Sequence, residues 1–363
     1  MKRSLGIILT VLLANSLVLT GAEEQKTAIM TYQVYGKMHV SLDSLDSGDK
    51  SDLYLSSNQS RLGFKGELEL APGLKTIWQL ESHVNLDEAG STLASRDTYV
   101  GLASGLGKLI AGRMDTPCKN VSRKLDVFGD QLGDTRNILG YGTSGFDLRS
   151  DNTVAYISPS LAGAVATLAY KTTDEIREND IASGNIFWTS NVLTLAVAVE
   201  QHGAMVSGTD TNVPADGKID VASAEKELAV RAGGAVKLDN LTLMGLYEML
   251  QNSKGVDGAD RVTYGGGIAY KLSKIAAIKD ATVKAQYYIS EETDGKPDTG
   301  ATLLSVGVDY ELSQKTIVYV AYSETQNDAK AAVSMSGGGH GDKITPTAGK
   351  DPSGVSLGLA YAF

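Results

Sequence analysis

The chain has a single cysteine, Cys118, so it cannot form an internal disulfide bond, and an exported fold of this size needs another source of rigidity. Proline is also scarce, with 7 in 363 residues, and there are only 5 phenylalanines and 2 tryptophans. Glycine (40) and tyrosine (16) are frequent by contrast, which favours strands joined by turns over helices. A closed ladder of hydrogen bonds between strands would supply the rigidity that disulfides do not.

Long apolar runs are confined to residues 1–22. Lys2 and Arg3 precede an apolar run over 5–19, and small residues follow it. This pattern is typical of a secretory signal peptide, and we expect its removal to leave residues 23–363 as the mature chain. The alternative, a membrane anchor, is disfavoured because about fifteen apolar residues are few for a spanning helix. Basic residues are also in deficit, since the formal net charge is −10, and this argues against a nucleic-acid partner.

Alternation of apolar with small or polar residues is the most regular feature of the remaining chain. In residues 355–363 every second residue is apolar, and the residues between them are serine, glycine or alanine. This period of two marks a strand with one apolar face. The pattern recurs at 32–42, 62–70, 228–238, 262–272, 283–289 and 304–312, and less regularly near 106–113, 150–158, 161–171 and 183–190. We count about sixteen such segments, an even number as single-chain bacterial barrels require, and no sustained helical stripe.

Strands with one apolar face fit two architectures. A soluble sandwich buries the apolar faces against each other, whereas a barrel in an outer membrane turns them toward lipid and encloses water. An apolar strand at the chain end would be an aggregation-prone edge in a soluble protein. Tyrosines near the ends of the apolar sets also fit an interfacial girdle. The sequence therefore favours an all-β, transmembrane, antiparallel barrel, with short turns at one rim and long polar loops such as 203–224 and 326–353 at the other.

Several motifs invite a catalytic or metal-binding interpretation that their context does not support. Residues 140–145 match G-x-G-x-x-G, but a dinucleotide site needs a strand before the motif and a helix after it. The glycine-rich stretch 337–341 lacks the spacing of a phosphate loop and is interpreted as a flexible external loop. The histidines lack the ligand spacing of a zinc site, and we expect His39 and His83 to point into water. Cys118 is interpreted as an incidental loop thiol. We therefore expect no enzymatic activity, no cofactor and no metal.

Short stretches spread along the chain give it a family resemblance: VYGK at 34–37, SRLGFKG at 60–66, SRDTYVGL at 95–102, AGR at 111–113, VFGD at 127–130 and the terminal Phe363. In this order and spacing they resemble the general porins of Gram-negative outer membranes, most closely the trimeric porins of beta-proteobacteria. The resemblance implies a homotrimer of 16-stranded barrels in the bacterial outer membrane. It also implies a water-filled channel for passive diffusion of ions and small hydrophilic solutes. Lipid, lipopolysaccharide and the barrel-assembly machinery would be partners, with Phe363 as the assembly signal.

The resemblance further implies a third loop, residues 114–146, that folds into the barrel and carries carboxylates opposite a basic wall. The wall residues that match are Lys37, Arg61, Arg96 and Arg149, with Lys65 and Arg113 as secondary charges of the lumen. On the loop, the candidate acids are Asp126 and Asp130, followed by Asp115 and Asp134. Alternation independently places Lys37 and Arg61 inside, whereas Arg96 shares its parity with the apolar Val100 and Leu102.

The electrostatics of such a constriction follow from the charges themselves, whatever the family. Opposite unit charges held about 8 Å apart, at an effective dielectric constant of roughly 20, attract by about 2 kcal/mol. Because salt screens charges beyond roughly 8 Å, rings of local charge should set ion selectivity, rather than the net charge of the chain. A channel for one solute, such as a sugar or dicarboxylate, is an alternative, but few aromatic residues are present to form a binding slide. An outer-membrane enzyme is a further alternative, disfavoured by the missing catalytic constellation.

Overall fold

The computed structural model describes residues 30–140, 145–172, 180–203 and 225–363. The signal peptide expected at 1–22 lies outside these residues and stays a prediction. The polar loop expected at 203–224, except for its first residue, also lies outside them.

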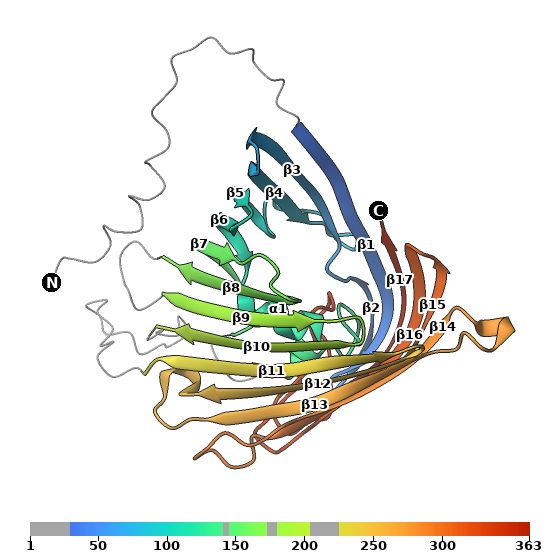
Figure 1. The fold of residues 1–363 in the computed structure, drawn as a ribbon. Coiled ribbons are helices and arrows are strands. Elements are labelled where there is room, and N and C mark those ends of the chain that lie inside the picture. Colours follow the sequence, from blue (N-terminus) through green and yellow to red (C-terminus); the bar gives the residue numbers. More distant parts are fainter. Residues whose placement is uncertain (1–29, 141–144, 173–179, 204–224) are drawn as a thin grey trace, which may run out of the picture.

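The described chain is built mainly from antiparallel strands of a single sheet (Figure 1). The strands are β1 (Met30–Asp46), β2 (Ser51–Ser57), β3 (Arg61–Ala71), β4 (Leu74–His83), β5 (Thr98–Ser104), β6 (Gly107–Asp115), β7 (Arg149–Ile157), β8 (Ala164–Lys171), β9 (Ile181–Thr189), β10 (Leu193–His202), β11 (Glu227–Leu238), β12 (Leu241–Gln251), β13 (Arg261–Lys271), β14 (Ala281–Ser290), β15 (Ala301–Ser313), β16 (Thr316–Asn327) and β17 (Ser353–Ala362). Apart from β2 and β3, strands adjacent in sequence pair, and β17 pairs with β1, so the sheet closes into a barrel. Short helical turns are η1 (Thr135–Asn137), η4 (Ser253–Gly255) and η5 (Ala276–Ile278).

Among the described residues, no helix has the length and apolar character needed to cross a membrane.

One position in the barrel wall is shared by two strands. β1 pairs with β2 over residues 40–46 and with β3 over residues 30–37, so β2 and β3 lie end to end beside it. The 17 strands of the sheet therefore make a 16-stranded barrel, which confirms the strand number indicated by the alternation. Between the two pieces the chain leaves the ladder, and Gln59 adopts a left-handed backbone conformation with φ of 54°.

The two faces of the strands divide as the alternation predicted. Outward-facing residues such as Val34 (49% exposed) and Leu357 (57%) are apolar, as expected for side chains that contact lipid. Inward-facing positions are often small and polar: the hydroxyl oxygens of Ser305 and Ser323 lie 2.9 Å apart and are buried. The less regular segments also form strands, namely β6, β7, β8 and β9.

The described part of the segment between β6 and β7 contacts polar side chains of the wall: the backbone N–H of Cys118 donates to Ser183 Oγ of β9 at 3.2 Å, and Asn185 Nδ2 of β9 donates to the Pro117 carbonyl at 2.8 Å. It starts with α1 (Pro117–Lys124), whose N-cap Thr116 accepts a hydrogen bond from the backbone N–H of Lys119. The alternation pattern gave no sign of this helix because eight residues are too few to display a stripe, although Thr-Pro is a recognised helix start. Buried apolar residues of this segment, including Val121, Leu132 and Phe146, form one core with residues of the wall.

The glycine-rich stretch 337–341 packs against other segments and does not form the flexible external loop expected from its composition. The backbone N–H of Gly338 donates to Asn137 Oδ1 at 2.7 Å, and that of Gly341 donates to Asn58 Oδ1 at 2.7 Å. Gly339 lies so close to the Arg136 guanidinium that an added Cβ would collide with it. Glycine is needed here for close approach between backbone and side chain rather than for flexibility.

His39 differs from expectation, because a buried polar partner holds it. His39 is 1% exposed, and its Nε2 lies 2.9 Å from the Tyr319 hydroxyl, so it does not point into water. His340 is buried as well, with Nε2 3.0 Å from Asp43 Oδ2. His83 is half-buried.

Candidate functional site

Lys37 and Arg61 lie opposite each other on β1 and β3 and converge on one carboxylate of the β6–β7 segment. The Oδ2 atom of Asp130 is 3.1 Å from Lys37 Nζ and 3.6 Å from Arg61 Nη1. The Oδ1 atom of Asp130 is 2.9 Å from Arg136 Nη2, so three cations surround it. Burial alone would raise the pKa of Asp130, but Lys37, Arg136 and Arg61 outweigh burial and lower it. Charges of the wall and of the loop are thus in direct contact here, rather than separated by the distance of about 8 Å assumed in the sequence analysis.

Asp134 is held within the loop. It is fully buried and accepts hydrogen bonds from the backbone N–H of Asp130 at 2.8 Å and from Arg136 Nη2 at 2.5 Å. It also caps η1 by accepting from the backbone N–H of Arg136. Its position supports Asp130 and Arg136 rather than meeting a basic residue of the wall.

Asp126 is likewise bound by its own loop. Its Oδ1 accepts from the backbone N–H of Phe128 at 2.7 Å, and its Oδ2 accepts from the backbone N–H and hydroxyl of Thr135 at 2.9 and 3.0 Å. Burial, together with the nearby Asp134 carboxylate, raises the pKa of Asp126 to about 8. The geometry therefore brings Asp130 to the wall, while Asp126 and Asp134 shape the loop that carries it.

Asp115 and Arg149 belong to a second cluster, at the base of α1. Asp115 Oδ1 is 2.8 Å from Arg149 Nη2 and 3.2 Å from Lys119 Nζ, and its Oδ2 contacts Arg123. Arg149 Nε also contacts Asp97 Oδ1 at 2.6 Å. Arg149 therefore pairs with two carboxylates, and Asp115 pairs with three cationic side chains.

Arg96 lies just before β5, so the parity of that strand does not extend to it. Its Nε contacts Glu81 Oε1 at 2.5 Å, and its Nη1 donates to Gln59 Oε1 at 2.5 Å. The sequence analysis did not identify Glu81 or Gln59 as residues of the site. Glu81 could have been found from β4, where it shares its parity with Gln79 and not with Trp78. Nothing in the sequence marked Gln59, because its contacts depend on the break between β2 and β3.

The two residues expected as secondary charges lie in different places. The Lys65 ammonium lies 5.1 Å from the centroid of the Tyr35 ring, close enough for a cation–π contact. Arg113 instead pairs with Asp151, whose side chain is 60% exposed. The structure therefore brings Lys65 toward Lys37 and Arg61 but leaves Arg113 outside this group.

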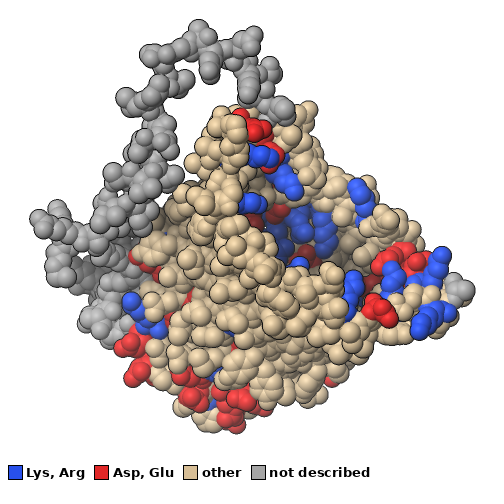
Figure 2. Space-filling model, viewed as in Figure 1, with Lys and Arg blue, Asp and Glu red and all other residues tan. Residues whose placement is uncertain are grey.

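Two cavities meet beside Lys37. One, with a volume of about 370 Å³, is lined by charged residues of the wall and of α1: Lys37, Arg61, Lys65, Arg96, Arg123, Glu81 and Asp97. The other, of about 440 Å³, is lined by Lys37 and Arg123 again, with Arg136, Lys284, Lys315, Asp126, Asp130 and Asp309. Figure 2 shows a hollow in the molecule where Lys and Arg gather and where fewer Asp and Glu are visible. The lumen at this level is therefore polar and predominantly basic.

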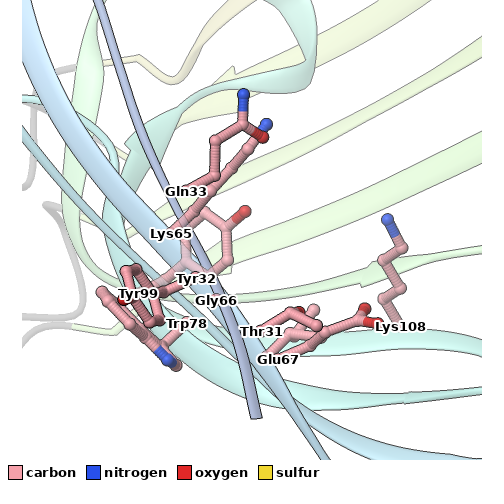
Figure 3. A pocket seen from close by; sticks show the side chains of 10 residues that line it. Thr31, Tyr32, Gln33, Lys65, Gly66, Glu67, Trp78, Tyr99 and Lys108 are labelled. Atoms are coloured by element: carbon pink, nitrogen blue, oxygen red, sulfur yellow. The ribbon is translucent and has the colours of Figure 1, made fainter.

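A third cavity, of about 500 Å³, continues the lumen toward the N-terminal end of β1. Its lining includes Gln33, Lys65, Tyr99 and Lys108. Gln33 and Lys65 are cross-strand neighbours, and Figure 3 shows their side chains extending in the same direction. Lys65 thus lies between the charged group around Lys37 and this cavity.

The chain end closes the barrel next to these residues. The backbone N–H of Phe363 donates to Gly36 O at 3.1 Å, and the backbone N–H of Gly36 donates to Phe363 O at 3.2 Å. The Phe363 ring stacks on Tyr361 with a centroid distance of 5.9 Å. Phe363 therefore has a structural role in closure, and its role as an assembly signal stays a prediction.

Comparisons with known proteins identify the family. Residues 9–330 match the model of the family described as Gram-negative porin. The chain is 27% identical over 156 residues to the major outer membrane protein P.IB of Neisseria gonorrhoeae, covering 42% of this chain and 43% of that protein. It is 32% identical over 149 residues to the major outer membrane protein P.IA of Neisseria meningitidis serogroup B, covering 40% and 36%. The matched region thus spans less than half the length of each relative.

Solved structures share the fold along the whole barrel. An anion-selective porin from Comamonas acidovorans superimposes with a TM-score of 0.76 at 19% identity, covering 92% of this chain and all of that one (100%). Salmonella typhi OmpF, solved in complex with daunomycin, gives a TM-score of 0.64 at 15% identity, covering 92% and 97%. With the closed barrel and the family match, these findings show that the chain belongs to the Gram-negative porins, transmembrane β-barrels of the bacterial outer membrane.

Proposed function

We propose that this porin is a passive channel for ions and small hydrophilic solutes, and that residues 114–146 form its constriction loop. The observation that carries the proposal is the contact of Asp130 with Lys37 and Arg61, which joins the loop to the wall between two polar cavities. Charged groups that line a water-filled passage replace part of the hydration shell of a solute without any covalent step. The proposal therefore includes no enzymatic activity and no cofactor.

We further infer a preference for anions. The cavity beside Arg61 is lined by five basic and two acidic side chains, so positive charge is in excess where the loop contacts the wall. The Comamonas acidovorans porin with the same fold is described as anion-selective, which supports this inference.

Assembly is the remaining part of the proposal. We infer that residues 23–363 form the mature chain, that three copies associate, and that the barrel-assembly machinery reads Phe363. The exposed apolar residues of the outer face support contact with lipid and lipopolysaccharide. A Vibrio cholerae outer membrane protein of similar fold was solved in a trimer form.

Recording from planar bilayers tests the function. Three equal conductance steps per insertion and a current that does not saturate with solute concentration would support a general trimeric channel. Block by a single sugar or dicarboxylate would instead support the solute-specific alternative. Combining Arg61→Ala with Arg96→Ala should shift the zero-current potential in a salt gradient toward cations. An unchanged zero-current potential would show that neither arginine contributes to the constriction.

A further inference from the structure

We propose that Gln59 is a positioning residue that sets the selectivity of the channel by holding Arg61 and Arg96 with neutral acceptors. The inference deepens the proposed function, because it concerns the same constriction. Gln59 lies at the break between β2 and β3 and has a φ of 54°, a conformation uncommon for a residue other than glycine. Strained backbone of this kind persists where the surroundings fix it, and it occurs often at functional sites.

The left-handed conformation lets one residue bind two arginines from different parts of the wall. The side-chain Oε1 of Gln59 accepts from Arg96 Nη1 at 2.5 Å, and its backbone carbonyl accepts from Arg61 Nη1 at 3.2 Å. An extended Gln59 would continue the ladder beside β1 and would turn its carbonyl or its side chain away from one of the two guanidinium groups. The break between β2 and β3 therefore positions hydrogen-bond acceptors for both Arg61 and Arg96.

The neighbours of Gln59 fix the break on both sides. Asn58 is buried and donates from Nδ2 to Ser41 Oγ at 2.7 Å. Ser60 Oγ accepts from the backbone N–H of His39 at 2.9 Å and donates to the His39 carbonyl at the same distance. These hydrogen bonds replace the ladder bonds that the chain gives up, so the conformation of Gln59 does not depend on the arginines alone.

The chemistry of the amide explains why this residue affects selectivity. An amide oxygen accepts from a guanidinium without adding negative charge, whereas a carboxylate would neutralise it. Arg96 already has one carboxylate partner, Glu81 at 2.5 Å, and Arg61 has Asp130 at 3.6 Å. With Gln59 as a neutral second partner for each, the two arginines stay ordered and the cavity keeps its positive excess.

The test compares three variants in planar bilayers under a salt gradient. Gln59→Glu adds a charge beside both arginines, and we expect it to lower the ratio of anion to cation permeability at least threefold. Gln33→Glu is the matched control, because it adds the same charge on the inner face of β1, beside Lys65 and away from Arg61 and Arg96. We expect Gln33→Glu to change the logarithm of the permeability ratio by less than half as much as Gln59→Glu does. Gln59→Gly keeps the backbone acceptor and tolerates the left-handed conformation. It should lower the ratio of anion to cation permeability about twofold. The temperature at which the folded barrel unfolds, followed by its change in gel migration after heating, should stay the same.

The outcomes separate this inference from the function on which it rests. Absence of channel activity in the wild-type protein would overturn the proposed function itself. Wild-type channels that prefer anions, with equal shifts for Gln59→Glu and Gln33→Glu, would overturn only the role of Gln59. A Gln59→Gly variant that loses thermal stability but keeps the wild-type permeability ratio would show that Gln59 supports the fold and not the selectivity.

Discussion

Replacing Asp130 by asparagine should make the channel more permeable to anions. The variant removes a carboxylate that lies within 3.6 Å of two wall cations and 2.9 Å of Arg136. The side chain keeps its shape, and the backbone N–H of Asp130 remains bound to Asp134. Because neighbouring cations lower the pKa of Asp130, the wild-type group is ionised at neutral pH, and the change at the constriction is a full unit of charge.

The size of the effect follows from Coulomb's law. An anion that passes about 7 Å from Asp130 gains about 0.6 kcal/mol if the medium behaves as bulk water, and about 2.4 kcal/mol at an effective dielectric constant of roughly 20. Since about 1.4 kcal/mol corresponds to a factor of ten, the smaller value already gives an increase of about threefold in relative anion permeability. Salt screens charges beyond roughly 8 Å at physiological strength, so the shift should grow in dilute salt.

The assay is the zero-current potential across a bilayer with a tenfold gradient of potassium chloride. Asp298→Asn is the matched control, because it removes the same charge from an exposed ion pair with Lys330. We expect the control to leave the potential near the wild-type value. An unchanged potential for Asp130→Asn, or a shift toward cations, would refute the placement of Asp130 beside the conducting path.

Three further changes test other parts of the structure. Burial raises the pKa of Asp126 to about 8, so its carboxyl group loses its proton as the pH rises through that value. Cation permeability should then increase between about pH 7 and 9 in the wild type and stay flat in Asp126→Asn; identical pH profiles would assign the titration to another group. In the wild type, Arg231 Nε lies 2.5 Å from the buried Glu248 carboxylate. Arg231→Met leaves that carboxylate without its cation and should lower the free energy of unfolding by about 3–5 kcal/mol. The barrel should unfold at a lower temperature on gels, with partial recovery when Glu248→Leu is added, and an unshifted temperature would contradict this ion-pair argument. Gly36→Ala places a methyl group against the Phe363 ring and should reduce the fraction of folded barrel recovered from outer membranes, whereas full recovery would show that this closure tolerates the added group.

The barrel could be predicted because alternation is a local property. A strand whose outer side contacts lipid must place an apolar residue at every second position, and this holds for Val34 and Leu357 alike. Alternation along β1 and β3 likewise assigns Lys37 and Arg61 to the inner face, because the apolar residues next to them in sequence point outward. The closed 16-stranded barrel confirms the strand architecture that the alternation predicted.

The errors concern segments whose conformation depends on distant partners. Helix α1 is too short to show a period, and its buried side rests on strands β9, β10 and β11. The stretch 337–341 was interpreted from its glycine content, which permits flexibility and close packing equally. His39 has a buried partner 280 residues away in Tyr319, a contact that no local pattern can reveal.

Strand parity is fixed residue by residue, so it was enough to predict the apolar outer side of the barrel and the inner position of Lys37 and Arg61. Which carboxylate contacts these two cations depends instead on how the loop folds. Asp126, Asp130 and Asp134 are chemically identical and lie within one loop, but hydrogen bonds inside the loop take up Asp126 and Asp134 and turn Asp130 toward Lys37 and Arg61. Likewise, the break at Gln59 joins Arg61 to Arg96 through space, a relation that exists only once the chain has closed on itself.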